Sequence, residues 1–274
     1  IALAFFYPVL QGKGIFQSDI TQYTGMAKER NDYRQTENKE TYWTNSAFGG
    51  MPTYQLGAQY PNDLVKQLDR TLRFLPRPAD YLFLYFVGFY ILLLVLKVDY
   101  KNAFLGAIAF GLSTYLIIIL GAGHNSKAHA IAYFAPVLAG ILLVFQRKYL
   151  WGGLLTAVAL ALELSANHFQ MTYYLLLLVL LLGAGLLYKA VKEKQLNDFG
   201  KATAVLVGAV VVSILANATL LLTTREYADW STRSKSTLTF TPEGTPKKQS
   251  SGLSHEYITE YSYGITESLN LIVP

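Results

Sequence analysis

Apolar residues gather along the chain in blocks of about 20, separated by polar segments. A helix of about 20 apolar residues crosses the roughly 30 Å hydrocarbon core of a membrane. The pattern therefore predicts an all-α multi-pass membrane protein with six spans, at residues 81–98, 103–121, 130–145, 150–165, 171–188 and 202–222. A shorter apolar run at residues 1–10 would be about 15 Å long as a helix. We interpret it as the truncated first of about seven spans.

Composition supports the membrane class. Hydrophobic residues make up 52% of the chain and charged residues only 15%, where a soluble domain has about 25% charged residues. The formal net charge of +5 is modest, and its distribution matters more than its sum in a membrane protein, so we expect no nucleic-acid partner. The absence of cysteine excludes disulfides, thiol catalysis and cysteine metal sites. Since the chain starts inside an apolar run without an initiator Met, we expect a fragment of a longer protein.

Lysine and arginine are unevenly distributed between the short loops. The loops on one side carry eight cations: Lys97, Lys101, Arg147, Lys148, Lys189, Lys192, Lys194 and Lys201. The loops on the other side, residues 123–129 and 166–170, carry only Lys127. Cytoplasmic loops are enriched in Lys and Arg, so we expect the second set to be extracytoplasmic. The two long polar segments then lie on that outer face as well.

These long segments define the expected domain organisation. Residues 11–80 form a first extracytoplasmic loop, residues 81–222 the six-helix region, and residues 223–274 the start of a second large loop with a strand-like stretch at 237–241. In the first loop, apolar residues recur at helical spacing over 62–75, with charged residues between them. This pattern is typical of an amphipathic helix, which either lies in the membrane interface or packs against the rest of the loop.

One carboxylate is a candidate for chemistry at the outer surface. Asp19 follows the first apolar run by only nine residues, so a general base at this position would lie close to the membrane. The alternative is structural, because Asp19 with Gln22 resembles a helix N-cap and its capping-box partner. Local sequence favours the cap.

All four histidines fall on the expected outer face. His124, Lys127 and His129 share one short loop, and such a cluster suits an anion such as phosphate. Ordinary capping and headgroup contacts are the nearest alternative, and a metal site is a weaker one because the loop has no carboxylate. Six further residues are candidates for lining an outer cavity or for contacting an anion: Glu163, Asn167, His168, Arg225, Arg233 and Lys235.

Five segments together carry a family resemblance. They are Q-S-D-I-T-Q-Y-T-G-M, Y-W-T-N-S-A-F-G-G-M-P-T-Y, L-R-F-L-P-R-P-A-D-Y, G-A-G-H-N-S-K-A-H-A and A-N-H-F-Q-M-T-Y-Y. With these segments the chain resembles the N-terminal part of the YfhO family of bacterial membrane proteins. That family is thought to be similar to glycosyltransferases of the GT-C fold, which use polyprenyl-phosphate sugars as donors. The resemblance implies a multi-pass protein of the bacterial cytoplasmic membrane with a catalytic acid in its first outer loop.

Carried over to this chain, the resemblance implies transfer of a sugar from a polyprenyl-phosphate donor to an extracytoplasmic glycan or protein acceptor. Asp19 matches the position of the catalytic acid and becomes the expected base. Lys127, His124 and His129, with Arg225, would bind the donor phosphate. The short outer loops have no further acids, so we expect no metal cofactor, although a divalent cation is not excluded. The alternatives are a transporter or flippase of lipid-linked glycans and a non-catalytic membrane scaffold.

Overall fold

The computed structural model describes residues 1–231, 234, 240, 243–246, 253–260, 262 and 264–271. These residues form two compact units, Ile1–Leu221 and Leu222–Pro274. The elements of the first unit are α1 (Ala2–Phe5), α2 (Tyr7–Leu10), α3 (Ser18–Met26), α4 (Lys28–Glu37), β1 (Trp43–Thr44), β2 (Met51–Pro52), η1 (Thr53–Leu56), α5 (Leu64–Leu72), α6 (Ala79–Val95), α7 (Tyr100–Gly111), α8 (Thr114–Ala122), α9 (Asn125–Ala132), α10 (Phe134–Phe145), α11 (Tyr149–Ser165), α12 (Phe169–Lys192) and α13 (Leu196–Ala216).

The boundary between the units falls within α14 (Ala218–Ala228), and the second unit also contains α15 (His255–Thr259) and η2 (Glu267–Leu271). Phe240 and Pro246 form an isolated antiparallel bridge there. The rest of the expected strand at 237–241, together with Arg233 and Lys235, lies outside the described residues.

The described helices make this an all-α membrane protein. Three are long and apolar enough to cross a membrane: α9 with α10 as one segment (Asn125–Phe145), α12 and α13. Leucine side chains on α12 and α13 are exposed on the surface, with exposed fractions of 73% for Leu181 and 67% for Leu215. Contiguous apolar surface of this kind needs a hydrocarbon neighbour. The apolar helices α6 and α11 are shorter, with 17 residues each, so seven spans stay a prediction.

The segment expected to be one uninterrupted span at 103–121 is broken. α7 and α8 meet at an angle of 47°, and count as a fourth span only if the bent pair is taken together. α7 ends at Gly111, which packs directly against the ring of Phe86 on α6. A Cβ added to Gly111 would come within 2.5 Å of that ring. α7 thus stays packed on α6, and α8 turns away to end at Gly123 with φ +85°.

Close helix packing gives the bundle its core. α10 and α11 approach each other at Gly152, where an added Cβ would lie 2.5 Å from the backbone nitrogen of Val144. Small residues at such crossings let membrane helices pack backbone to backbone. Tyr81 and Tyr85 of α6 are fully buried in the main hydrophobic cluster, together with Leu120 of α8.

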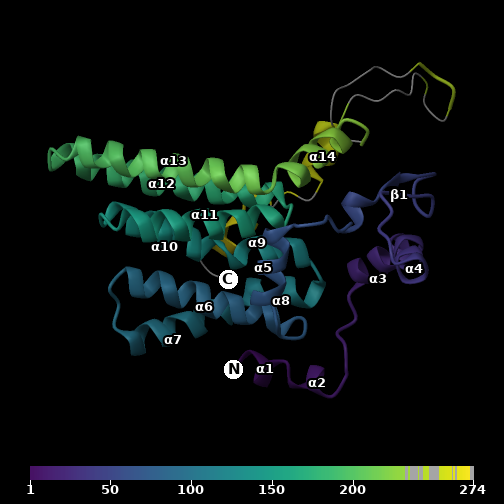
Figure 1. The fold of residues 1–274 in the computed structure, drawn as a ribbon, viewed down its shortest axis with the longest axis horizontal. Coiled ribbons are helices and arrows are strands. Elements are labelled where there is room, and N and C mark those ends of the chain that lie inside the picture. Colours follow the sequence, from purple (N-terminus) through teal and green to yellow (C-terminus); the bar gives the residue numbers. More distant parts are fainter. Residues whose placement is uncertain are drawn as a thin grey trace. The chain divides into compact units, whose positions relative to one another are not determined.

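The turns that follow α6, α10 and α12 lie at one end of the bundle, on the left in Figure 1. The Gln146 amide donates to the Val95 carbonyl at 2.9 Å, and Arg147 forms an ion pair with Asp198 at 2.5 Å. Most of the cations of the short loops therefore gather at this end, which we call the cationic end. The first loop, α8 and the start of α9 lie at the opposite end, which we call the cavity end (Figure 1).

The first loop is an ordered structure. The Glu29 carboxylate on α4 accepts a hydrogen bond from the Thr44 hydroxyl at 2.6 Å and from the backbone N–H groups of Asn45 and Ser46 at 2.8 and 3.0 Å. These bonds hold the turn that follows β1, and they lower the pKa of Glu29, the Thr44 bond being the largest cause. Nearby, the buried Arg30 donates to the Leu56 carbonyl at 2.5 Å.

Gly50 should be intolerant of a side chain. Its φ of +124° is a conformation that L-residues rarely adopt, and an added Cβ would come within 2.7 Å of the Trp43 ring. We expect Gly50→Ala to destabilise the loop by about 1–3 kcal/mol. Native-state proteolysis of the first loop measures this, because cleavage tracks the population of the opened segment. Gly14→Ala, which meets nothing within 4 Å, is the matched control; equal cleavage rates for the two variants would contradict the prediction.

Candidate functional site

A cavity of about 610 Å³ opens at the cavity end of the first unit. Its walls come from α3, η1, α5, the α8–α9 turn, the α11–α12 turn and the end of α13. Five cations line it: Lys66, Arg70, Arg73, Arg77 and Lys127. Three carboxylates also line it: Asp19, Asp63 and Asp69. With its histidines neutral the lining therefore carries a net positive charge, which suits an anionic ligand.

Asp19 and His124, which are 105 residues apart in the sequence, meet in this cavity. Nδ1 of His124 lies 2.9 Å from Oδ2 of Asp19. Both side chains are about half exposed, at 46% for His124 and 49% for Asp19. The structural alternative for Asp19 is contradicted, because α3 begins at Ser18 with Gln17 as its N-cap and Asp19 lies inside the first turn. The carboxylate thus faces a histidine instead of capping its own helix.

The meeting of α3 with the α8–α9 turn is fixed by Gln17. Its amide donates to the Leu120 carbonyl at 2.7 Å. Gly123 adopts φ +85°, and an added Cβ at this position would come within 2.7 Å of the Gln17 side chain. Both the positive φ and the lack of space for a Cβ require a glycine at this position. The contact sets the start of α3 against the residue that precedes His124.

Lys127 and His168 lie beside this pair. Lys127 is half-buried on the first turn of α9, and His168 is the N-cap of α12. Burial lowers the pKa of His168, and the charges of Lys127 and His124 act in the same direction. The first turn of α9 also presents backbone N–H groups at the cavity, where a helix N-terminus favours an anion. Asn167 lines the same wall with φ +54°.

His129 lines the cavity, and its ring is bonded to a buried carboxylate. It was expected to bind phosphate beside Lys127, but it is buried, and its Nε2 lies 2.5 Å from Oδ1 of Asp69. The Tyr133 hydroxyl donates to the same oxygen at 3.1 Å. On a helix, His129 lies one turn and a half beyond His124, so it points toward α5 and away from the first turn of α9.

Asp69 is the centre of a buried polar network. Its second oxygen accepts two bonds from the Arg73 guanidinium, at 2.9 and 2.5 Å. Arg73 also lies 3.4 Å from Asp80 and stands over the Tyr81 ring. Burial by itself raises the pKa of Asp69, but the hydrogen bonds from His129 and Arg73 outweigh it and hold the pKa well below the ordinary value. The carboxylate is therefore ionised and joins α5 to α6 and α9.

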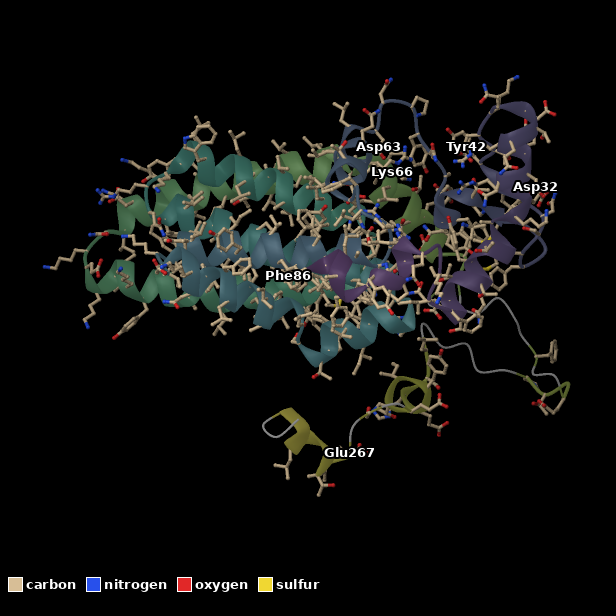
Figure 2. The ribbon with its side chains drawn as sticks, turned by 90° about the horizontal axis from the view of Figure 1, so that it is seen from below. Asp32, Tyr42, Asp63, Lys66, Phe86 and Glu267 are labelled. Carbon is tan, nitrogen blue, oxygen red and sulfur yellow. The ribbon has the colours of Figure 1, made fainter. Side chains whose placement is uncertain are left out.

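The sequence pattern identified α5 as amphipathic but did not show where its charged face points. That face turns into the cavity, with Lys66 donating to the Ala58 carbonyl at 3.0 Å. Figure 2 shows Lys66 near Asp63, whose carboxylate caps the helix. Burial lowers the pKa of Lys66, against the opposing charge of Asp63. The available signal for a cavity wall was the set of four charges between the apolar positions, which recur after three or four residues: Lys66, Asp69, Arg70 and Arg73.

Glu163 does not line the cavity, contrary to the expectation from its sequence position. Its side chain is fully buried, and its Oε1 accepts a hydrogen bond from the Thr172 hydroxyl at 2.9 Å. That hydroxyl also lies 3.5 Å from the His168 carbonyl. Packing of α11 against α12 thus places Glu163 behind the cavity wall that His168 forms.

Two further expectations stay predictions. Arg225 is exposed on α14 in the second unit, and its role in phosphate binding is not tested. In the described part of the chain, no group of three or more histidine and carboxylate side chains could hold a metal ion. The expectation of a metal-independent site rests on the sequence alone.

The fold and the cavity define a helical membrane protein with a cationic polar cavity at one end. Comparison of the chain with protein-family models, with curated proteins and with solved structures finds no match.

Loss of the Asp69 carboxylate should destabilise the protein strongly. Removing one member of a buried ion pair costs about 3–5 kcal/mol because its partners stay buried without compensation. We expect Asp69→Asn to lower the free energy of unfolding in detergent micelles by about this amount. Asp32→Asn is the control, because Asp32 pairs with Lys28 on the exposed face of α4 and such pairs contribute about 1 kcal/mol or less.

The stabilisation that the Asp69 carboxylate provides should be lost at low pH. The native pKa of Asp69 lies below its ordinary value of 3.8, so its stabilisation is fully present above that value and is lost as the pH falls through the native pKa. The difference between wild type and Asp69→Asn should be constant from about pH 8 to 5 and shrink only below about pH 4. A difference that disappears already near pH 6 would contradict this assignment.

Proposed function

We propose that this protein transfers a sugar from a polyprenyl-phosphate donor to an extracytoplasmic acceptor, as a GT-C-like glycosyltransferase with about seven spans. The observation that carries the proposal is the placement of Asp19, His124 and Lys127 in one cationic cavity at one end of membrane helices. Such a cavity offers both a base and an anion site, the two groups that this reaction needs. Its volume of about 610 Å³ is in the range of about 300–1,000 Å³ of small-molecule sites.

Lys127 and the first turn of α9 would hold the donor phosphate. The Lys127 ammonium forms no hydrogen bond or ion pair with side chains of the described residues. An ammonium and unpaired helix N–H groups stabilise the negative charge that develops as phosphate leaves. His129 lines the same cavity, but its Nε2 is bonded to Asp69, so Lys127 and His124 carry the proposal without it.

The Asp19–His124 pair would remove the proton of the acceptor hydroxyl. A carboxylate and an imidazole in hydrogen-bond contact are a common arrangement for general base catalysis. The pair and Lys127 line one cavity, so a donor phosphate at Lys127 would place the sugar beside the base. A non-catalytic scaffold would need neither group.

The lipid part of the donor would reach the cavity along α5. Leu64 and Leu68 are exposed on the outer face of this helix, at 74% and 40%, and Phe74 follows at 68%. Val65 and Leu72 pack against the main hydrophobic cluster. α5 therefore has one apolar face inside the protein and further apolar residues free to lie in the membrane interface.

A flippase of lipid-linked glycans is the second candidate, and the break between α7 and α8 favours it. Transporters bind substrates where discontinuous helices end near a cavity, and α8 ends at Gly123, in the cavity wall. A flippase needs the cationic cavity but no base. The two candidates therefore differ in their dependence on Asp19.

Asp19→Asn should lower the rate of sugar transfer about 100-fold or more, because a general base contributes a factor of about 10²–10⁴. The assay uses the full chain in lipid vesicles with a polyprenyl-phosphate hexose, and measures the release of polyprenyl phosphate. Asp32→Asn is the control, since Asp32 lies on α4 away from Asp63 and Lys66 (Figure 2). Equal rates for wild type and Asp19→Asn, at matched protein levels, would remove Asp19 from the mechanism and favour the flippase.

The orientation can be tested separately with single introduced cysteines, because these 274 residues contain no cysteine. We propose that the cavity end is extracytoplasmic, as the cation distribution indicates. In intact cells a membrane-impermeant maleimide should label Lys39→Cys in the first loop and leave Lys148→Cys at the cationic end unlabelled until the cells are opened. Both lysines are exposed, so the reverse labelling pattern would invert the proposed topology.

A further inference from the structure

We propose that the acceptor proton passes to Nε2 of His124, and that Asp19 acts through His124 as a positioning residue. This inference rests on the proposed function and deepens it. The sequence resemblance places the base at Asp19 alone. The structure instead gives a pair of residues from two segments of the chain, and the two members of the pair have different chemical roles.

Hydrogen-bond chemistry assigns these roles. An ionised carboxylate only accepts hydrogen bonds, so the 2.9 Å contact requires His124 to donate from Nδ1. In the neutral ring Nε2 then carries the free lone pair. No residue in the described part of the chain forms a hydrogen bond with this nitrogen. It is free to accept a proton in a cavity where His124 is about half exposed.

The ordinary chemistry of the two side chains favours the imidazole as the base. An imidazole has an ordinary pKa of about 6.5, against about 3.9 for an aspartate. A base works best when its pKa lies near the working pH, which favours the imidazole under neutral conditions.

The backbone holds both members of the pair in position. The His124 N–H donates to the Ile119 carbonyl at 3.2 Å, and its own carbonyl accepts from Ala128 at 2.9 Å. Gln17 fixes the other side through its bond to Leu120. A base held in this way needs little reorganisation before reaction.

His124 shares the cavity with charges of both signs. Lys127 on the same helix, His168 at the start of α12 and the cations of α5 line this cavity, together with His129, the carboxylates of Asp19, Asp63 and Asp69 and the side chains of Tyr23, Tyr54 and Tyr60. During the reaction, Asp19 and the negative charge that grows on the leaving phosphate offset the cations.

The step is balanced without a further reactant. The acceptor oxygen forms a bond to the anomeric carbon, and its proton passes to Nε2 of His124. The bond from that carbon to the phosphate oxygen breaks, and its electron pair leaves on the polyprenyl phosphate. The imidazolium then returns the proton to water.

The wild-type pH profile tests the inference without a variant. With a polyprenyl-phosphate hexose as the probe and the full chain in vesicles, kcat/KM for release of polyprenyl phosphate should fall about tenfold per pH unit on the acid side of a midpoint in the range typical of histidines. A rate that stays flat from about pH 8 to 5 would overturn the inference, because an aspartate base remains ionised over that range.

Chemical rescue assigns the proton to one residue. We expect His124→Ala to lower the rate about 10²–10⁴-fold and added imidazole to restore it in proportion to its concentration, which a purely structural loss would not allow. Asp19→Asn should keep a residual rate that still titrates in the histidine range. Rescue of Asp19→Ala by formate, with wild-type activity in His124→Ala, would overturn this inference alone and leave the proposed function in place. Absence of release by the wild type at any pH would overturn both.

Discussion

The buried carboxylate of Asp69 is the interaction on which the cavity depends. It lies on α5, in the first loop, and binds His129 and Tyr133 of the helical bundle. It also holds Arg73, which reaches Asp80 and Tyr81 at the start of α6. A membrane-surface helix carrying these charges would otherwise expose them to water. The network turns them inward and builds one wall of the site.

The opposite wall depends on close backbone packing. The bend between α7 and α8 and the glycine at 123 place the first turn of α9 at the start of α3. His124 then meets Asp19, and Lys127 lies one helical turn further on. Each wall joins a segment of the first loop to the bundle, so the loop and the helices form the site together. The bundle supplies His124 and Lys127, and the first loop supplies Asp19 and the cations of α5.

The apolar pattern predicted the helices well, because long periodic segments determine their own secondary structure. It placed α10, α11 and α12 within a few residues of their observed ends. It missed the bend at 112–113, because the contact of Gly111 with Phe86 is tertiary. It also favoured a cap for Asp19, because capping is a local signal and the partner histidine is 105 residues away.

The residues of the candidate site were also predicted only in part. Lys127, His124, Asn167 and His168 were predicted and do line the cavity. His129 also lines the cavity, but its Nε2 is bonded to Asp69. Glu163 has the right residue type and spacing, but packing buries it behind the cavity wall. Asp69, Arg70 and Arg73 were recognised only as charges on an amphipathic helix. The direction of a charged helix face depends on its partners, and here those partners lie 60 or more residues further along the chain.

The most direct test of the account is a structure of the full chain with bound polyprenyl phosphate. The account predicts the phosphate within hydrogen-bond distance of the Lys127 ammonium and the first-turn N–H groups of α9, with the Asp19–His124 pair beside it. A lipid phosphate bound elsewhere, with this cavity empty, would contradict it.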